Sequence, residues 1–169
     1  MKIEKVKWLK SIPESQSHGT GTFQKRLWKV ISDYIRIRDF YKYKSCISCG
    51  KMVLDWRDTD WQAGHYHPYS VCKGYSKFAI DNVFGQCSYC NRGFNGAPAG
   101  AMFKDMIIAR YGEEHLKKIE RYKYQPPEKI EDNIIVEKIK EVLELMKDLP
   151  EKPDYYDRVM DKLLEENML

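Results

Sequence analysis

The sequence predicts an α+β fold in which a metal ion holds a few short strands together among flanking helices. Two Cys-x-x-Cys pairs, at residues 46–49 and 87–90, enclose a region of short extended stretches. Turn residues separate these stretches from one another. Apolar residues at helical spacing precede the first pair and follow the second. We therefore expect a small zinc-bound core with flanking helices and a helical extension at the C-terminus.

The N-terminal part divides into an arm and a helix. Residues 15–21 are polar and contain two glycines, so residues 1–22 are predicted to form a flexible arm in which His18 is solvated. From residue 22 to about residue 41, apolar residues recur at helical spacing. One side of this helix is basic and carries Lys25, Lys29 and Arg36. This basic side either contacts nucleic-acid phosphates or is a solvated helix surface, and we give the two interpretations equal weight.

The middle of the chain alternates between strands and turns. Short strands are predicted at residues 52–54, 61–67 and 78–86, and Pro68 ends the second of them. A helix is expected to begin at Asn91, to break at the glycines and proline of residues 93–100, and to resume over residues 101–111. Gly112 would end that helix, and another would cover residues 113–122. These boundaries predict one domain at residues 23–122 and an extension at residues 123–169.

The C-terminal extension is predicted to be helical at residues 128–148 and 154–166. Apolar residues of the first helix repeat at alternating steps of four and three, which is a short heptad pattern. These residues are Ile135, Ile139, Val142, Met146 and Leu149. The favoured interpretation is packing against the rest of the chain, and a homodimer formed through residues 135–149 is the alternative.

Charge is distributed unevenly along the 169 residues, whose net charge is +4. Residues 1–50 carry eleven Lys and Arg against four Asp and Glu, whereas residues 113–169 carry eleven against sixteen. A basic front half suits a polyanionic partner such as DNA. No apolar run is long enough to cross a membrane, and the N-terminus lacks the apolar core of a signal peptide. The sequence therefore predicts a cytoplasmic protein without a membrane partner.

The two cysteine pairs predict a structural zinc site. Cys46, Cys49, Cys87 and Cys90 have the spacing of a four-thiolate site split between two turns. Because the protein would fill all four positions, such an ion leaves no open position for a substrate. The fifth cysteine, Cys72, is expected to be a free thiol outside the site. Zinc would thus stabilise the strands and the following helix.

The order of these motifs resembles that of the HNH, or ββα-metal, nucleases. Their pattern is a Cys-x-x-Cys-Gly turn, a histidine that ends a strand, an asparagine further on, and a Cys-x-x-Cys pair followed at once by histidine or asparagine. Over roughly residues 22–122 the sequence is more similar still to the phage NinG/Rap recombination endonucleases. The segments that carry this resemblance are Tyr34–Asp39, Cys46–Gly50, Ala63–Tyr66, Asp81–Cys87, Cys90–Arg92 and Ile107–Glu114.

The resemblance implies hydrolysis of DNA phosphodiester bonds, with a preference for branched recombination intermediates of the Holliday-junction or D-loop type. It implies that His65 is the general base, since a neutral imidazole can accept a proton near pH 7. Asn82 would hold the loop and orient His65, and Asn91 would give an oxygen to a catalytic divalent ion. Asn95 is a second ligand candidate, and Arg92 would contact phosphate. A phage origin would locate the protein in the bacterial host cell.

The sequence departs from the general HNH pattern at Gly64. Many HNH sites have an acidic residue or a histidine directly before the base, as a metal ligand. Either His65 binds the ion itself, or another side chain supplies the ligand. The candidates, in order of preference, are His67, Asp81 and Asp60. A set rich in amides suits Mg²⁺ or Mn²⁺ better than a second zinc.

Two functions are therefore compatible with the sequence. The first is a metal-dependent endonuclease acting on branched DNA. The second is a zinc-ribbon-like module that binds nucleic acid or protein without catalysis, an alternative that the missing ligand at Gly64 keeps open.

Overall fold

The computed structural model describes residues 6–93 and 99–166 and divides the chain into two compact units. Unit 1 contains residues 1–34 and 130–169, and unit 2 contains residues 35–129. The first long helix, α1 (Thr22–Tyr43), contributes residues to both units. This division differs from the one expected from the sequence, in which the arm, the central domain and the extension follow one another along the chain.

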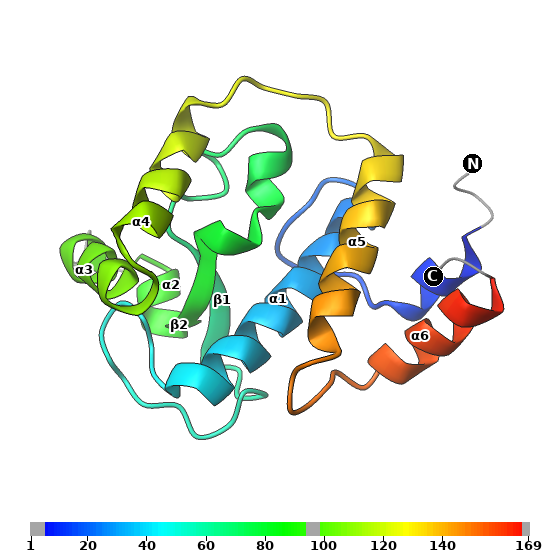
Figure 1. The fold of residues 1–169 in the computed structure, drawn as a ribbon, viewed down its shortest axis with the longest axis horizontal. Helices are drawn as coiled ribbons and strands as arrows, with labels where there is room; N and C mark the ends of the chain where they lie inside the picture. The colour runs from blue at the N-terminus through cyan, green and yellow to red at the C-terminus, as the bar shows by residue number, and fades with distance from the viewer. Residues whose placement is uncertain (1–5, 94–98, 167–169) are drawn as a thin grey trace. The chain divides into compact units, whose positions relative to one another are not determined.

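Unit 2 is built around two antiparallel strands, β1 (Trp61–His65) and β2 (Val83–Cys87). The pairing joins Trp61 to Cys87 at one end and His65 to Val83 at the other. The short helix α2 (Ser88–Asn91) follows β2 directly and lies beside the strand pair (Figure 1). This register places the start of β1 beside Cys87, and α2 continues from Cys87 alongside the strand pair.

The strand pair is held against α1 by buried polar contacts within unit 2. The indole of Trp61 is buried and donates from Nε1 to the Arg36 carbonyl oxygen at 2.9 Å. Asp39 is also buried, and its carboxylate accepts the Gly85 N–H at 2.7 Å. A side chain at position 85 would overlap the Trp61 ring, so only glycine allows this close packing.

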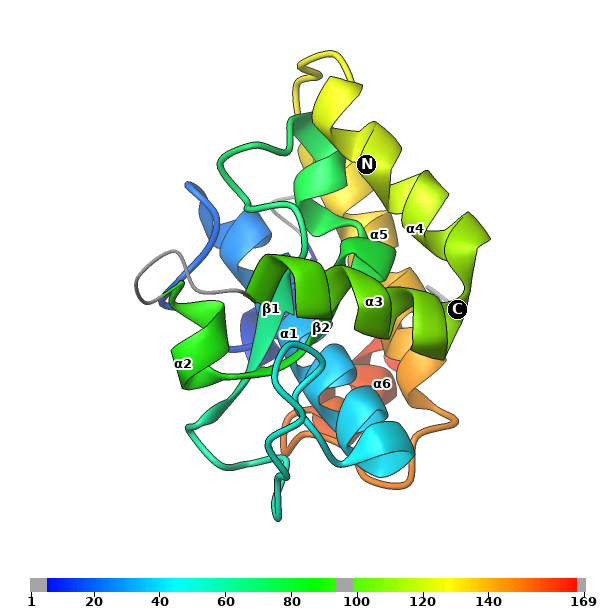
Figure 2. The same cartoon turned by 90° about the vertical axis from the view of Figure 1, so that its left-hand side faces the viewer.

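Two further helices, α3 (Ala99–Tyr111) and α4 (Glu113–Glu120), cover the other side of the strand pair. Figure 2 shows α3 crossing in front of the strands. Phe84 of β2 packs edge-to-face on Phe103 of α3, with ring centroids 5.6 Å apart. Gly112 separates α3 from α4 with φ of 88°, as its predicted role as a helix stop requires. The core of this side is formed by Ile47, Phe84, Phe103, Ile107, Leu116 and Ile119.

Unit 1 contains the N-terminal part of α1 with α5 (Asp132–Met146) and α6 (Tyr156–Glu165). A short 3₁₀ helix, η2 (Lys7–Ser11), packs on α6, and the Lys162 ammonium donates to Ser11 Oγ at 2.7 Å. Trp8, Leu9 and Ile12 are almost completely buried. The segment expected to be a flexible arm thus supplies core residues. Its apolar side chains precede the polar stretch at residues 15–21 and are buried in unit 1.

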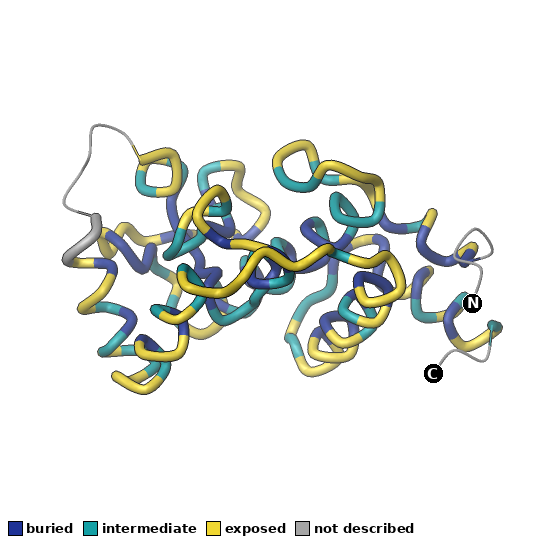
Figure 3. Tube along the Cα trace, turned by 90° about the horizontal axis from the view of Figure 1, so that it is seen from above, coloured by how far each residue is buried: buried dark blue, intermediate teal, exposed yellow. Residues whose placement is uncertain are grey.

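The heptad pattern of the extension is buried within the single chain. Ile135, Ile139, Val142 and Met146 have no exposed surface. Figure 3 shows how buried and exposed residues alternate along the helices. Packing against the chain itself, the favoured interpretation, accounts for this seam, and we do not propose it as a dimer surface.

Several predicted elements differ from those observed. Residues 52–54 form no strand, and only an isolated bridge joins Met52 to Ser45. The strand predicted at residues 78–86 begins only at Val83, because the connection from β1 contains two 3₁₀ turns, η3 (Gly74–Phe78) and η4 (Ile80–Asn82). Helix α2 begins at Ser88, so Asn91 ends this helix instead of starting it. The turn that brings Cys90 towards Cys87 is itself helical, and sequence spacing alone does not reveal that.

One further finding concerns membranes. Among the described residues, no helix combines the length and apolarity needed to cross a bilayer.

Candidate metal centre and active site

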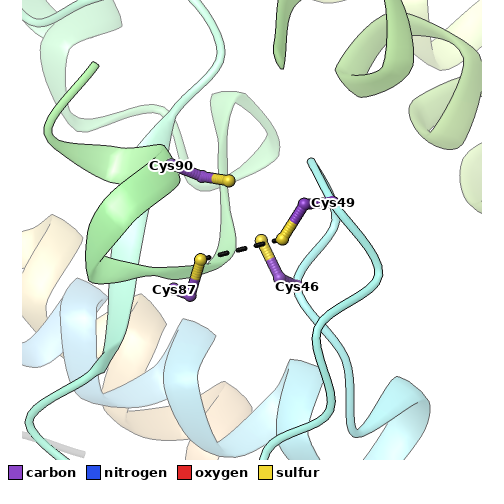
Figure 4. Close-up of side chains that lie close together, drawn as sticks. All are labelled: Cys46, Cys49, Cys87 and Cys90. Carbon is purple, nitrogen blue, oxygen red and sulfur yellow. Dashed lines mark hydrogen bonds between the residues drawn. The ribbon is translucent and has the colours of Figure 1, made fainter. Parts of the chain in front are cut away.

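Four cysteine side chains converge on one point in unit 2. Cys46 and Cys49 come from the loop after α1, Cys87 ends β2, and Cys90 lies in α2 (Figure 4). Their Sγ atoms all lie within 4.8 Å of one another. The Sγ atoms of Cys49 and Cys87 are 3.8 Å apart. Zinc–sulfur bonds in a regular tetrahedron require a sulfur–sulfur distance of about 3.8 Å, so the cluster has the size of a zinc site.

Backbone hydrogen bonds fix the first cysteine turn. The Cys46 N–H donates to the Lys51 carbonyl at 2.8 Å, and the Gly50 N–H donates back to the Cys46 carbonyl at 2.9 Å. Gly50 has φ of 74°, a conformation that glycine adopts without strain. The Ile47 N–H donates to the Gly85 carbonyl at 3.1 Å and ties this turn to β2. Both halves of the cluster are therefore anchored to the same strand.

Two of the four thiols, those of Cys46 and Cys90, lie in surroundings that disfavour charge unless a cation is bound, whereas hydrogen bonds lower the pKa of Cys49. Burial raises the pKa of Cys46 to about 11, and burial together with the neighbouring thiols also raises the pKa of Cys90. A divalent cation reverses this preference, because thiolates bind it with release of their protons. Cys72 lies outside the cluster: it is buried, and its thiol donates to the His67 carbonyl at 3.5 Å. The residues present fit one structural metal ion.

His65 is the last residue of β1, and a backbone carbonyl orients its imidazole. Its Nε2 lies 2.9 Å from the Lys77 carbonyl oxygen, and Tyr69 packs edge-on against the ring. A carbonyl oxygen only accepts hydrogen bonds, so the neutral ring carries its proton on Nε2. Nδ1 then holds the lone pair and can accept a proton.

Asn82 is completely buried at the end of η4, directly before β2, and holds the loop that follows β1. Its side-chain amide bonds both backbone polar groups of His67. It also donates to the Cys72 sulfur at 3.4 Å. These bonds fix the loop beside the imidazole, and the imidazole itself is oriented by Lys77.

Asn91 extends from the end of α2 towards Gly64. It is exposed, and its Nδ2 donates to Gln62 Oε1 at 2.9 Å. A Cβ atom built on Gly64 would overlap Gln86 Oε1 and Asn91 Oδ1. Two amide oxygens therefore occupy the space in which a side chain at position 64 would lie. His65 is the next residue in the chain, so these oxygens lie close to the end of β1.

Gln86 is the residue that reasoning from the sequence missed. It immediately precedes Cys87, and strand register pairs it with Gln62. Paired residues share one face of a sheet, and Gly64 lies two residues from Gln62 on that face. The alternation of the strands could have identified Gln86, had the register of β1 and β2 been predicted.

Of the other candidates for the missing ligand, the two carboxylates are engaged with different partners. The Asp81 carboxylate accepts from the Tyr122 hydroxyl at 2.7 Å and pairs with Lys118. The Asp60 carboxylate binds the Lys51 ammonium and the Ser88 hydroxyl. His67 Nε2 is buried and lies 3.5 Å from Glu120 Oε2, but it makes no hydrogen bond among the described residues. Asn95 lies outside the described residues.

The predicted DNA-contacting residues differ in their surroundings. Lys29 pairs with Asp33 at 2.6 Å. The Arg36 guanidinium donates to the Trp56 and Asp58 carbonyls at 2.7 and 3.1 Å. Lys25 is half-buried, and Arg92 is exposed directly after Asn91. Arg36 thus stabilises the loop before β1, and phosphate contact by any of the four stays a prediction.

Comparison with known proteins places the chain in one family. The family model described as bacteriophage lambda NinG protein matches residues 2–152. This match extends past the region of resemblance noted in the sequence and includes α5, for which no motif was recognised. No curated protein and no solved structure matched the chain. Because the match covers most of its length, the chain belongs to the bacteriophage lambda NinG family.

Proposed function

We propose that this protein is a divalent-metal-dependent endonuclease that hydrolyses phosphodiester bonds in branched DNA during phage recombination. In this proposal zinc fills the four-cysteine cluster as a structural ion, and Mg²⁺ or Mn²⁺ acts at a separate site. The NinG family match supports a phage role. The nuclease activity is argued from the arrangement around β1.

The observation that carries the proposal is the juxtaposition at the end of β1. His65 ends the strand with a proton-accepting Nδ1, and Gly64 beside it faces the Asn91 and Gln86 oxygens. Hydrolysis of a phosphodiester needs a base for the attacking water and positive charge near the phosphate oxygens. The base and the oxygens that would hold the ion are thus associated with two adjacent residues at the end of β1, on opposite faces of the strand.

The roles of the chain's own residues follow from these contacts. His65 takes the proton of the attacking water at Nδ1, while Lys77 holds the ring through Nε2. Asn82 keeps the loop from moving the imidazole. Asn91 would hold the divalent ion through Oδ1, since its Nδ2 is engaged with Gln62. The ion, when bound, supplies charge stabilisation to the phosphate. Gly64 and His65 are adjacent in β1, so the ion and the imidazole would lie on opposite faces of the strand. A substrate phosphate would therefore have to bind at the end of β1 to reach both.

The four-cysteine cluster has a supporting role. It joins the loop after α1 to β2 and α2, the elements that carry Gln86 and Asn91. A closed thiolate site leaves no position for substrate, so zinc stabilises the site without entering the reaction.

The test is cleavage of a four-way junction and of a linear duplex of matched sequence, in Mg²⁺ or Mn²⁺, by the zinc-loaded protein. We expect the junction to be cut and His65→Ala to bind it without cutting. His115→Ala is the matched control, because His115 Nε2 also lies 2.9 Å from a backbone carbonyl oxygen, that of Asp81, but on α4. The control should cut.

The alternative function predicts a different result. A zinc-ribbon-like binding module would bind the junction but leave it intact in every metal, and wild type and His65→Ala would be indistinguishable. That result would reject the nuclease proposal.

A further inference from the structure

The space above Gly64 contains two amide oxygens that approach each other. A Cβ at this position would overlap Gln86 Oε1 and lie against Asn91 Oδ1, so the two oxygens are neighbours. Both carry partial negative charge. Within the residues that the structure describes, neither oxygen accepts a hydrogen bond. Adjacent amide oxygens of this kind are an arrangement that a cation or water would stabilise.

Each amide is oriented by a hydrogen bond from its nitrogen. Gln86 is 3% exposed and donates from Nε2 to Ser48 Oγ in the first cysteine turn. Asn91 donates from Nδ2 to Gln62 Oε1 at 2.9 Å, and Gln62 in turn donates from Nε2 to the Thr59 carbonyl at 3.2 Å. Because both nitrogens are engaged, both oxygens are directed to the space over Gly64.

We propose that Gln86 Oε1 and Asn91 Oδ1 together bind a hard divalent cation, Mg²⁺ or Mn²⁺, with Gln86 replacing the ligand that position 64 lacks. This inference rests on the proposed function, whose catalytic ion it assigns to a second residue of this chain. Amide oxygens are ligands that Mg²⁺ and Mn²⁺ accept, whereas zinc favours nitrogen and sulfur. Gly64 is required because any side chain there would displace both oxygens.

The neutral ligand pair has a consequence for affinity. Two uncharged oxygens leave the full charge of the ion available to substrate phosphate, so the ion should bind weakly to protein alone and more tightly with DNA. A carboxylate at position 86 adds negative charge at nearly unchanged shape and should tighten binding to protein alone.

The experiment measures Mn²⁺ binding to the zinc-loaded protein without DNA, by electron paramagnetic resonance. We compare wild type with Gln86→Met, Gln86→Glu and Gly64→Ala, and use exposed Gln125→Met as the matched control. Gln86→Met and Gly64→Ala should weaken binding about tenfold or more, on the scale of changes around metal ligands. Gln86→Glu should bind more tightly than wild type, and Gln125→Met should match it.

Zinc content and circular dichroism identify any variant that fails to fold. If Gln86→Met does not fold, Gln86→Glu still decides, because a carboxylate at the proposed ligand position must change the Mn²⁺ affinity and an affinity equal to that of wild type would overturn the inference. Mn²⁺ binding that is absent in wild type, or is the same in wild type and Gln86→Glu, would overturn the inference.

The inference and the proposed function fail in different ways. A protein that cuts DNA but binds Mn²⁺ independently of position 86 retains the proposed function and loses the inference. A protein that binds Mn²⁺ through Gln86 but never cuts a junction retains the inference as a cation site and loses the proposed function.

Discussion

Asn82 binds both backbone polar groups of His67. Its Oδ1 accepts the His67 N–H at 2.9 Å, and its Nδ2 donates to the His67 carbonyl at 3.1 Å. Residue 82 begins the return towards β2, and residue 67 lies just after β1, so this single side chain closes the connection between the two strands. The loop beside the proposed base is thereby fixed in one conformation.

Removing this amide should destabilise unit 2. Asn82 is fully buried, and Asn82→Ala leaves two buried backbone groups without their partner. We expect a loss of about 2–4 kcal/mol in the free energy of unfolding, measured by urea denaturation. Exposed Asn133→Ala on α5 is the control and should change it by less than about 0.5 kcal/mol. An Asn82→Ala protein as stable as wild type would contradict the role assigned to this residue.

Zinc should be stoichiometric and should depend on the four clustered cysteines. Metal analysis of the purified protein is expected to give about one zinc per chain. Cys49→Ser should lose it and lower the melting temperature, because the cluster joins the loop after α1 to β2. Cys72→Ser is the matched control, since Cys72 lies outside the cluster, and it should keep its zinc. Equal zinc content in both variants would contradict the assignment.

The stability of unit 1 should depend on pH through His18. Burial lowers the pKa of His18 below its ordinary value of 6.5, and the ring stacks on Trp28 at 4.4 Å. The unfolded chain then binds a proton more readily than the folded chain, so stability is complete above that value and falls as the pH drops below it. His18→Gln should reduce this dependence. Trp28 lies in unit 1. Denaturation followed by tryptophan fluorescence at several pH values would measure this dependence in wild type and in His18→Gln. Identical pH profiles for the two proteins would contradict the prediction.

Arg92 should contribute to DNA affinity through phosphate contact. It is exposed and follows Asn91 in the chain. Arg92→Ala should weaken junction binding and reduce the slope of log affinity against log salt by about one, because one fewer counterion is released. Lys138→Ala, on α5 and paired with Glu141, is the control and should leave the slope unchanged. If the slope for Arg92→Ala equals that of wild type, Arg92 makes no phosphate contact and is an ordinary surface charge.

The local patterns of the sequence predicted much of this fold. Helical spacing located α1, and the glycine at position 112 correctly separated α3 from α4. The two cysteine pairs predicted a cluster that the structure brings together. These features depend on spacing within short segments, which a sequence displays directly.

Features that depend on contacts between distant segments were not predictable in this way. Trp8 and Leu9 belong to a core completed by residues more than a hundred positions away. The role of Arg36 depends on its contact with the Trp56 carbonyl, which helical spacing does not show. Gln86 meets Asn91 over Gly64 only because of the register of β1 and β2. Sequence reasoning therefore identified the cysteine cluster but missed this neighbour of Asn91.

The most direct test of the central claim is the single-turnover rate of junction cleavage by His65→Ala, with saturating zinc-loaded protein and Mg²⁺. The account predicts that wild type cuts the junction and that the variant, binding it with equal affinity, cuts about 10²–10⁴-fold more slowly, the usual contribution of a general base. A variant that cuts at the wild-type rate, or a wild-type protein that binds the junction and never cuts it, would contradict the account.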